Sequence, residues 1–321
     1  MRILILGGSG FIGSNLADRL AKDGHEITLL DKNPPHQKAK NIRYVHGDIT
    51  EKITMKKAFK NIDVVYHLAS LLAKKGLPDA EYWKVNFEGT KNIFELSLSS
   101  KIKQLVYVSS AGIIKSTKNR PLKEGDPFEP DNAYKQTKIA CEKFLTSKSD
   151  KLNITICRPE SAYGPRDMGT VGLVKMIKNG RFIMPTSGKN LINPTYVSDI
   201  VQGFELVLMN EKAWGKTFIF AGKEIVTSRK FMEIMAELVD RKVSNLYIPE
   251  IISQAAATSL DFLGKHFKFT PPFSRLDLEF FQMNRFFDTS LARKDLGYKP
   301  GVGLKKGMKR TVEWYAENGF L

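Results

Sequence analysis

The chain has 321 residues, and its hydrophobic content of 42% is enough for a sizeable buried core. The formal net charge is +16, but the basic residues are scattered along the chain, which argues against nucleic-acid binding. Cys141 and Cys157 are its two cysteines, as expected in a reducing cytoplasm, and no apolar run approaches the ~20 residues of a membrane span.

The first 31 residues follow the pattern of a dinucleotide-binding unit. The apolar run Arg2–Leu6 leads into the glycine-rich segment Gly7–Gly13, and Ser14–Leu20 then has helical spacing. A second apolar run, Glu26–Leu30, closes at Asp31. A carboxylate at this place would accept hydrogen bonds from the hydroxyls of an adenine ribose.

Each glycine of the turn has a separate task in such a unit. Gly7 would make the tight turn, Gly10 would let the backbone approach a pyrophosphate, and Gly13 would let the helix pack closely on the strand. The helix that begins near Phe11 and Ile12 would offer its unpaired N–H groups and positive dipole end to the same pyrophosphate.

Apolar runs and helical patterns continue to alternate up to about residue 160. The alternation predicts a doubly wound parallel (Rossmann) α/β sheet of strand order 3-2-1-4-5-6-7, with helices on both faces and ligand at the carboxyl ends of the strands. A long helix is expected over Glu81–Ser99, and further strands over Ile42–His46, Asp63–Leu68, Gln104–Val108 and Thr217–Ala221.

Polar residues follow several of these strands. Asp48 comes after the third strand, where a carboxylate can reach the adenine amino group, and Ala69 and Ser70 come after the fourth, over the expected pyrophosphate and ribose. Ser109 and Ser110 follow the fifth strand.

A tyrosine and a lysine stand four residues apart on the next predicted helix. The segment Tyr134–Lys138 places both on one helical face, where an ammonium would lower the pKa of the phenol from its usual ~10. Such a tyrosine can exchange the proton of a secondary alcohol while a nicotinamide exchanges the hydride. The hydroxyl of Ser110 would bind the same substrate oxygen.

Together these motifs resemble the extended short-chain dehydrogenase/reductases, the epimerase/dehydratase superfamily, over nearly the whole chain. The resemblance rests on Gly7–Gly13, Asp31, Gly47-Asp48, His67–Ala69, Asn86, Ser109-Ser110, Tyr134/Lys138, Arg158–Pro165, Tyr196–Ile200, Phe287–Ser290 and Leu296–Pro300.

The resemblance implies an enzyme with the catalytic residues Ser110, Tyr134 and Lys138 and no metal. Asp31 favours NAD, while Lys32 beside it leaves NADP open, because a cation could receive a 2′-phosphate. The implied cofactor-binding residues are Gly7, Gly10, Phe11, Ile12, Gly13, Asp31, Asp48, Ile49, Leu68, Ala69, Ser70, Asn86, Tyr134, Lys138 and Pro159.

The second half of the chain lacks the regular alternation of strand and helix patterns. We expect residues 1–160, with 195–226 returning to them, to form the dinucleotide-binding domain, and 161–194 and 227–321 to form a substrate-binding cap. The cap carries many phenylalanines, which favour a core of its own over an apolar substrate pocket or a contact with a membrane surface. These are Phe262, Phe267, Phe269, Phe273, Phe280 and Phe281. The final helix, about Leu304–Asn318, has one apolar stripe for packing.

The substrate class depends on where arginines stand, because a site for a nucleotide diphosphate normally supplies them. Ile192 occupies the position where sugar-nucleotide members of the superfamily usually carry a phosphate-binding arginine, and the segment Leu278–Met283 contains no arginine. The segments Pro271–Arg275 and Phe287–Ser290 resemble the 3β-hydroxysteroid dehydrogenase and dihydroflavonol reductase branches. An apolar, lipid-like hydroxylated substrate is therefore favoured. Phosphate binding from another direction stays open through Arg166, Arg181, Arg275 and Arg285.

Two other outcomes use the same motifs. A nucleotide-sugar 4-epimerase or dehydratase would keep NAD tightly bound. A cofactor-sensing or structural protein would keep the glycine turn without using the catalytic residues, but the intact set of Ser110, Tyr134 and Lys138 argues against it. A homodimer is expected, because members of the superfamily commonly pair the helices that here span about Glu81–Ser99 and Asn132–Ser147.

Overall fold

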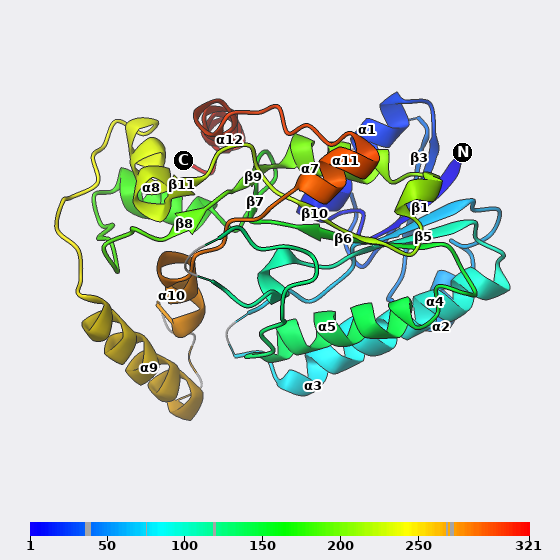
Figure 1. Cartoon of the computed structure of the whole chain (residues 1–321), viewed down its shortest axis with the longest axis horizontal. Helices are drawn as coiled ribbons and strands as arrows, with labels where there is room; N and C mark the ends of the chain where they lie inside the picture. Colours follow the sequence, from blue (N-terminus) through cyan, green and yellow to red (C-terminus); the bar gives the residue numbers. More distant parts are fainter. Residues whose placement is uncertain (36–39, 75, 118–119, 268, 270–272) are drawn as a thin grey trace.

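A seven-stranded parallel sheet forms the centre of the molecule (Figure 1). The computed structural model describes residues 1–35, 40–74, 76–117, 120–267, 269 and 273–321, so Pro271 and Pro272 of the predicted substrate segment lie outside it. The strand order is β10-β6-β5-β4-β1-β2-β3. The strands are β1 (Arg2–Leu6), β2 (Glu26–Asp31), β3 (Ile42–His46), β4 (Val64–His67), β5 (Gln104–Val108), β6 (Ile154–Pro159) and β10 (Thr217–Phe220).

This order confirms the predicted fold class and the predicted succession 3-2-1-4-5-6-7, with β10 as the seventh strand. Every neighbouring pair is parallel, and the register aligns Leu6 of β1 with Leu30 of β2 and His67 of β4. The carboxyl ends of these strands therefore lie at one edge, where a ligand of a doubly wound sheet is expected.

Helices cover both faces of the sheet. One apolar core joins the sheet to α1 (Phe11–Lys22), α7 (Val197–Leu206) and α11 (Ser290–Leu296). The other joins it to α2 (Lys52–Met55), α4 (Gly89–Ser99) and α5 (Ala133–Thr146). Strands buried on both faces explain the continuous apolar runs of the sequence.

The long helix predicted over Glu81–Ser99 is broken into three parts. Asp79–Tyr82 is α3, Trp83–Glu88 is a π-helical segment, and Gly89–Ser99 is α4. Asn86 lies in the wider turn of the π segment and is buried. Such turns commonly occur at functional sites.

The remaining α-helices lie in the segments expected to form the cap (residues 161–194 and 227–321), with short strands within and beside these segments. A third apolar core lies among α6, α8 and α12, and α12 buries Leu304, Met308, Val312 and Tyr315 as predicted. The helices are α6 (Val171–Lys178), α8 (Ser228–Glu237), α9 (Glu250–Phe267), α10 (Arg275–Gln282) and α12 (Leu304–Glu317). The two-residue strands are β7 (Ala162–Tyr163), β8 (Leu191–Ile192), β9 (Thr195–Tyr196) and β11 (Val226–Thr227).

The expected core role of the cap phenylalanines holds for only part of the set. Phe281 is 8% exposed and Phe280 packs against the same core. For Phe262, Phe267 and Phe269 the expectation is wrong, because all three are exposed to solvent. They lie on or just after α9, which touches the rest of the protein with a narrow stripe of small residues. No described helix is long and apolar enough to cross a membrane.

Candidate active site

A cavity of about 610 Å³ lies at the carboxyl ends of the central strands. Every predicted site residue except Asn86 lines it. The predicted residues that do so are Gly7, Gly10, Phe11, Ile12, Gly13, Asp31, Asp48, Ile49, Leu68, Ala69, Ser70, Ser110, Tyr134, Lys138 and Pro159. Residues that are far apart in the sequence are thus brought to a single hollow.

The glycine turn between β1 and α1 leaves no room for side chains at two positions. A Cβ on Gly7 would stand 2.6 Å from the backbone nitrogen of Ala69, and Gly7 has a positive φ of 79°. A Cβ on Gly13 would stand 2.3 Å from the Gly7 carbonyl oxygen. Gly10 is the N-cap of α1 and supplies no side chain to its first N–H groups. These groups are therefore available to an anion in the cavity.

Asp31 lies at the end of β2 with its carboxylate already positioned by backbone groups. One oxygen accepts a hydrogen bond from the Ser9 N–H at 3.1 Å, and the other accepts from the Asn33 N–H at 3.0 Å. Both contacts fix the carboxylate at the cavity wall, where a ribose diol would meet an acceptor without any rearrangement of the chain.

Lys32, the residue that left NADP open, is held by a different carboxylate. Its Nζ lies 2.7 Å from an Asp48 oxygen, and the Thr50 N–H donates to the other oxygen at 2.9 Å. Burial opposes the ionisation of Asp48, but these bonds outweigh it and lower the pKa of that carboxyl. A 2′-phosphate would have to compete with Asp48 for this lysine, which favours NAD.

Asn86 acts behind the cavity wall instead of lining it. Its side-chain oxygen accepts hydrogen bonds from the Ser70 hydroxyl at 3.1 Å and the Leu71 N–H at 2.7 Å, and its nitrogen donates to the Thr137 hydroxyl at 3.1 Å. The π-helical segment therefore ties the strand β4 exit to α5, the helix of Tyr134.

Tyr134 and Ser110 meet at the cavity surface. The Ser110 hydroxyl caps a short turn, accepts a hydrogen bond from the Gly112 N–H at 3.1 Å and also bonds Tyr134. The predicted lowering of the Tyr134 pKa is wrong for the protein alone. Burial raises the pKa of Tyr134 to about 12, and the bond with Ser110 opposes that rise only in part.

Lys138 explains why the expected charge effect is absent. Its Nζ donates to the Val108 carbonyl at 2.9 Å and stands 6.0 Å from the centre of the Tyr134 ring. Burial lowers the pKa of this ammonium to about 8, so its full charge is itself costly here. The phenol is thus protonated at neutral pH and is placed to donate.

Glu160 is a site residue that the sequence reasoning missed. It lines the cavity directly after β6, is buried, and accepts a hydrogen bond from the Ser161 hydroxyl at 2.6 Å. Burial raises the pKa of Glu160 to about 7, against the hydrogen bond of Ser161 and the charge of Arg285. The sequence does contain the same indication for Glu160 as for Asp31 and Asp48, namely a carboxylate directly after a parallel strand.

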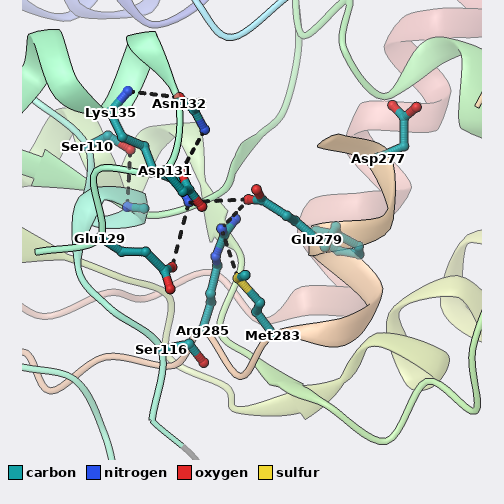
Figure 2. Close-up of polar contacts among 12 residues, drawn as sticks. Ser110, Ser116, Glu129, Asp131, Asn132, Lys135, Asp277, Glu279, Met283 and Arg285 are labelled. Carbon is teal, nitrogen blue, oxygen red and sulfur yellow. Dashed lines mark hydrogen bonds and ion pairs between the residues drawn. The ribbon is translucent and has the colours of Figure 1, made fainter. Parts of the chain in front are cut away.

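A charged cluster joins the cap to the start of α5 (Figure 2). Lys135, next to Tyr134, is almost fully buried, and its Nζ lies 2.7 Å from Asp131, 3.4 Å from Glu279 and 3.7 Å from Glu129. Glu279 on α10 also receives Arg285 at 2.6 Å. Through Glu279, helix α10 is bound to the end of α5 that carries Tyr134.

The four arginines considered for phosphate do not line the cavity. None of the described arginines is among its lining residues. Arg166 pairs with Asp18 at 2.7 Å and Arg285 pairs with Glu279, while Ile192 is buried in the cap core. The cavity wall also includes Leu71, Leu72 and Val85. No described group of three or more His, Cys, Asp or Glu residues could hold a metal ion.

Known proteins resemble the chain over its length. It is 26% identical to a 3-beta-hydroxysteroid dehydrogenase from Mycolicibacterium neoaurum, covering 98% of this chain and 92% of that protein. It is 25% identical to the N-acetyl-alpha-D-glucosaminyl-diphospho-ditrans,octacis-undecaprenol 4-epimerase of Escherichia coli O157:H7, covering 97% and 94%. The fold matches a UDP-glucuronic acid 4-epimerase from Bacillus cereus, solved with NAD, at a TM-score of 0.79 with 21% identity over 99% of each chain.

The model of the NAD dependent epimerase/dehydratase family matches residues 3–220, which include the glycine turn, Ser110, Tyr134 and Lys138. The chain therefore belongs to this family of the extended short-chain dehydrogenase/reductase superfamily, as an enzyme whose cofactor is NAD.

Proposed function

We propose that the chain is a dehydrogenase or reductase that interconverts a secondary alcohol and a ketone on an apolar, lipid-like substrate. The observation that carries the proposal is the meeting of Ser110 and Tyr134 at a cavity whose wall includes Leu71, Leu72 and Val85 but none of the described arginines. Burial of apolar substrate area, at roughly 25 cal/mol per Å², would then supply the binding energy that phosphate contacts supply elsewhere.

The cavity fits NAD on features of its own shape and charge. Cβ atoms at Gly7 and Gly13 would fill the turn, and the first N–H groups of α1 would be able to bind an anion there. Asp31 would hold the adenine ribose, with Asp48 and Ile49 near the adenine. Leu68, Ala69 and Ser70 would follow the pyrophosphate and ribose, and Lys138 and Pro159 would flank the nicotinamide end. Asn86 would support this site from behind by holding Ser70 and Leu71.

When bound, NAD supplies the hydride acceptor or donor. The protein has to hold the substrate oxygen and move one proton. Ser110 would bind that oxygen, and Tyr134 would donate its phenolic proton to it, a direction favoured by the raised pKa of the phenol. Lys138, anchored on Val108, would hold the nicotinamide ribose. Lys138 is buried, which keeps its ammonium away from bulk water.

The alternative is a nucleotide-sugar 4-epimerase with tightly held NAD. The Escherichia coli relative favours it, since that protein is named as the 4-epimerase of a diphospho-sugar. Even so, both relatives are named for compounds with a large apolar part, a steroid in one and undecaprenol in the other. An apolar substrate is common to the two, while a free UDP-sugar is not.

Thermal shift and absorbance assays with NAD present would separate these functions. We expect stabilisation, and formation of NADH, with members of a panel of hydroxysteroids and other apolar secondary alcohols, and none with UDP or UDP-sugars. Stabilisation by UDP or a UDP-sugar, with none by the apolar alcohols, would overturn the proposal in favour of the epimerase.

Three further features belong to the same proposal. The chain would divide into a dinucleotide-binding domain (1–160 and 195–226) and a cap (161–194 and 227–321). The free, buried thiols of Cys141 and Cys157 support a cytoplasmic location. A homodimer would pair the helical stretches of about Glu81–Ser99 and Asn132–Ser147 with their copies. Trp83 and Phe87 of the π-helical segment and Phe144 of α5 lie there in edge-to-face contacts near the surface. Light scattering that finds a monomer at micromolar concentration would refute the dimer.

A further inference from the structure

Helix α9 and the segment before it expose large apolar side chains in one part of the cap. Ile251 is 79% exposed, Phe262 is 69% exposed and Phe267 is 67% exposed. Leu246, Tyr247 and Ile252 are also exposed. Scattered exposed apolar residues are ordinary on a protein surface, but a contiguous group on one element indicates an interaction site.

The residues of α9 separate into three sectors around the helix axis at about 100° per residue. The inner sector is small and buried and contains Ser253, Ala257 and Gly264. A polar sector follows it with Glu250, Gln254 and Asp261. The remaining sector, which we call the outer face, carries the exposed apolar residues Ile251, Ile252, Phe262, Leu263 and Phe267, with the exposed Ser259 and His266 between them.

The helix is fixed to the body so that this outer face points away from it. The Ser253 hydroxyl donates to the Pro185 carbonyl at 2.6 Å, and the Asp261 carboxylate accepts from the Arg275 N–H at 3.0 Å. Figure 1 shows α9 at the edge of the molecule beyond α10. Helix α10 is in turn bound through Glu279 to Lys135 of α5, so α10 connects α9 with the helix that carries Tyr134.

Charge selects among the partners that an apolar face could take. Residues 241–275 contain five Lys or Arg against two acidic residues, within a chain of net charge +16. Arg241, Lys242 and Arg275 are exposed at the two ends of this region. A second copy of the chain would bring like charge to the interface, whereas an anionic lipid surface would attract it.

We propose that the outer face of α9 docks on an anionic lipid bilayer, with Ile251, Ile252, Phe262, Leu263 and Phe267 entering the boundary between headgroups and acyl chains. An amphipathic helix that lies in the plane of the interface, with its apolar side inserted and cations at the headgroups, binds membranes in this way. The docking goes beyond the proposed reaction and does not depend on it, although it would bring the cap to the place where a lipid-like substrate resides.

The test is vesicle flotation of the full chain with phosphatidylcholine vesicles that contain or lack phosphatidylglycerol. We expect the wild type to float with the anionic vesicles and far less with pure phosphatidylcholine. The double substitution Ile251→Ser/Phe262→Ser should lower the partition by about tenfold or more, since two large apolar side chains no longer enter the interface. Both side chains are exposed, so the fold should persist, and an unchanged NADH affinity would verify this.

Ile53→Ser is the matched control, because Ile53 is 71% exposed on α2, outside the outer face. It should float like the wild type. Equal flotation of the double variant and the wild type, or no flotation of the wild type, would overturn the proposal. So would a dimer that the double variant alone fails to form, because the outer face would then serve a second copy. Failure of the proposed reaction would appear separately, as no turnover of apolar alcohols in detergent.

Discussion

The glycine turn and helix α9 show two opposite relations between sequence and surroundings. At the turn, a Cβ on Gly7 or Gly13 would come within 2.6 Å or 2.3 Å of backbone atoms, so the residue type follows from sterics alone. On α9, the side chains of Ile251 and Phe262 meet mainly solvent, and nothing in the fold requires them to be apolar. Residue types that are fixed by close backbone contacts indicate a rigid site. Exposed apolar residues that the packing does not require indicate an interaction with a partner.

Two phenylalanines of the cap, one buried and one exposed, should differ most in what they contribute to stability. Phe281→Ala should lower the free energy of unfolding by about 3–5 kcal/mol, because its buried ring would leave a cavity. Phe262→Ala should change it by no more than about 0.5 kcal/mol, since the ring is exposed. Urea denaturation of both variants measures the two values. Similar losses in both would mean that α9 is packed against the protein in solution.

A second test concerns the steric demand at the turn. Gly7→Ala should lower the free energy of unfolding by about 3 kcal/mol and abolish NADH binding, because strain at positive φ adds to a collision with Ala69. Gly24 is the matched control, since its φ of 82° is similar but no atom lies within 4 Å of an added Cβ. Gly24→Ala should cost about 1 kcal/mol and leave NADH affinity unchanged. Equal effects would show that the conformation alone, without close approach, sets the requirement.

A third test depends on pH and concerns the burial of Glu160 in the cavity wall. The pKa of Glu160 rises on folding from its usual range to about 7, so the folded protein holds this proton more tightly and loses stability as pH rises through that interval. Glu160→Gln should remove the loss and stabilise the protein at pH 8 by up to about 3 kcal/mol, with no gain at pH 4. Glu313→Gln, on the exposed side of α12, should do neither. A gain at pH 4 equal to that at pH 8 would contradict a buried, proton-binding Glu160.

The sheet and most of the site could be predicted because their signals are local. Strand runs, the glycine turn and the spacing of Tyr134 and Lys138 each depend on a few neighbouring residues, and the parallel topology then brings their ends together. The exposure of Phe262 and the direction of the Tyr134 pKa shift depend on how distant segments pack. Burial outweighs the nearby ammonium for Tyr134, and no spacing rule contains that balance.

Asn86 and Glu160 could be predicted only in part, because each combines a local sequence signal with an effect of distant packing. Asn86 was recognised by family resemblance, but its position behind Ser70 and Leu71 depends on a π-helical segment that helix periodicity does not predict. Glu160 stands at a strand end like Asp31, yet its near-neutral pKa arises from burial between β6 and the cap. The position of Asn86 and the pKa of Glu160 both depend on tertiary packing, which a single sequence does not contain.

The central claim is that Tyr134 transfers the substrate proton in a cavity that binds NAD independently of that phenol. It is tested most directly by Tyr134→Phe, with turnover of the best alcohol of the panel and NADH affinity measured on the same preparation. We predict that turnover falls by ~10²–10⁴ while NADH affinity stays almost unchanged, because only the group that exchanges the substrate proton is lost. A variant that retains half of the wild-type turnover would place the chemistry elsewhere and contradict the account.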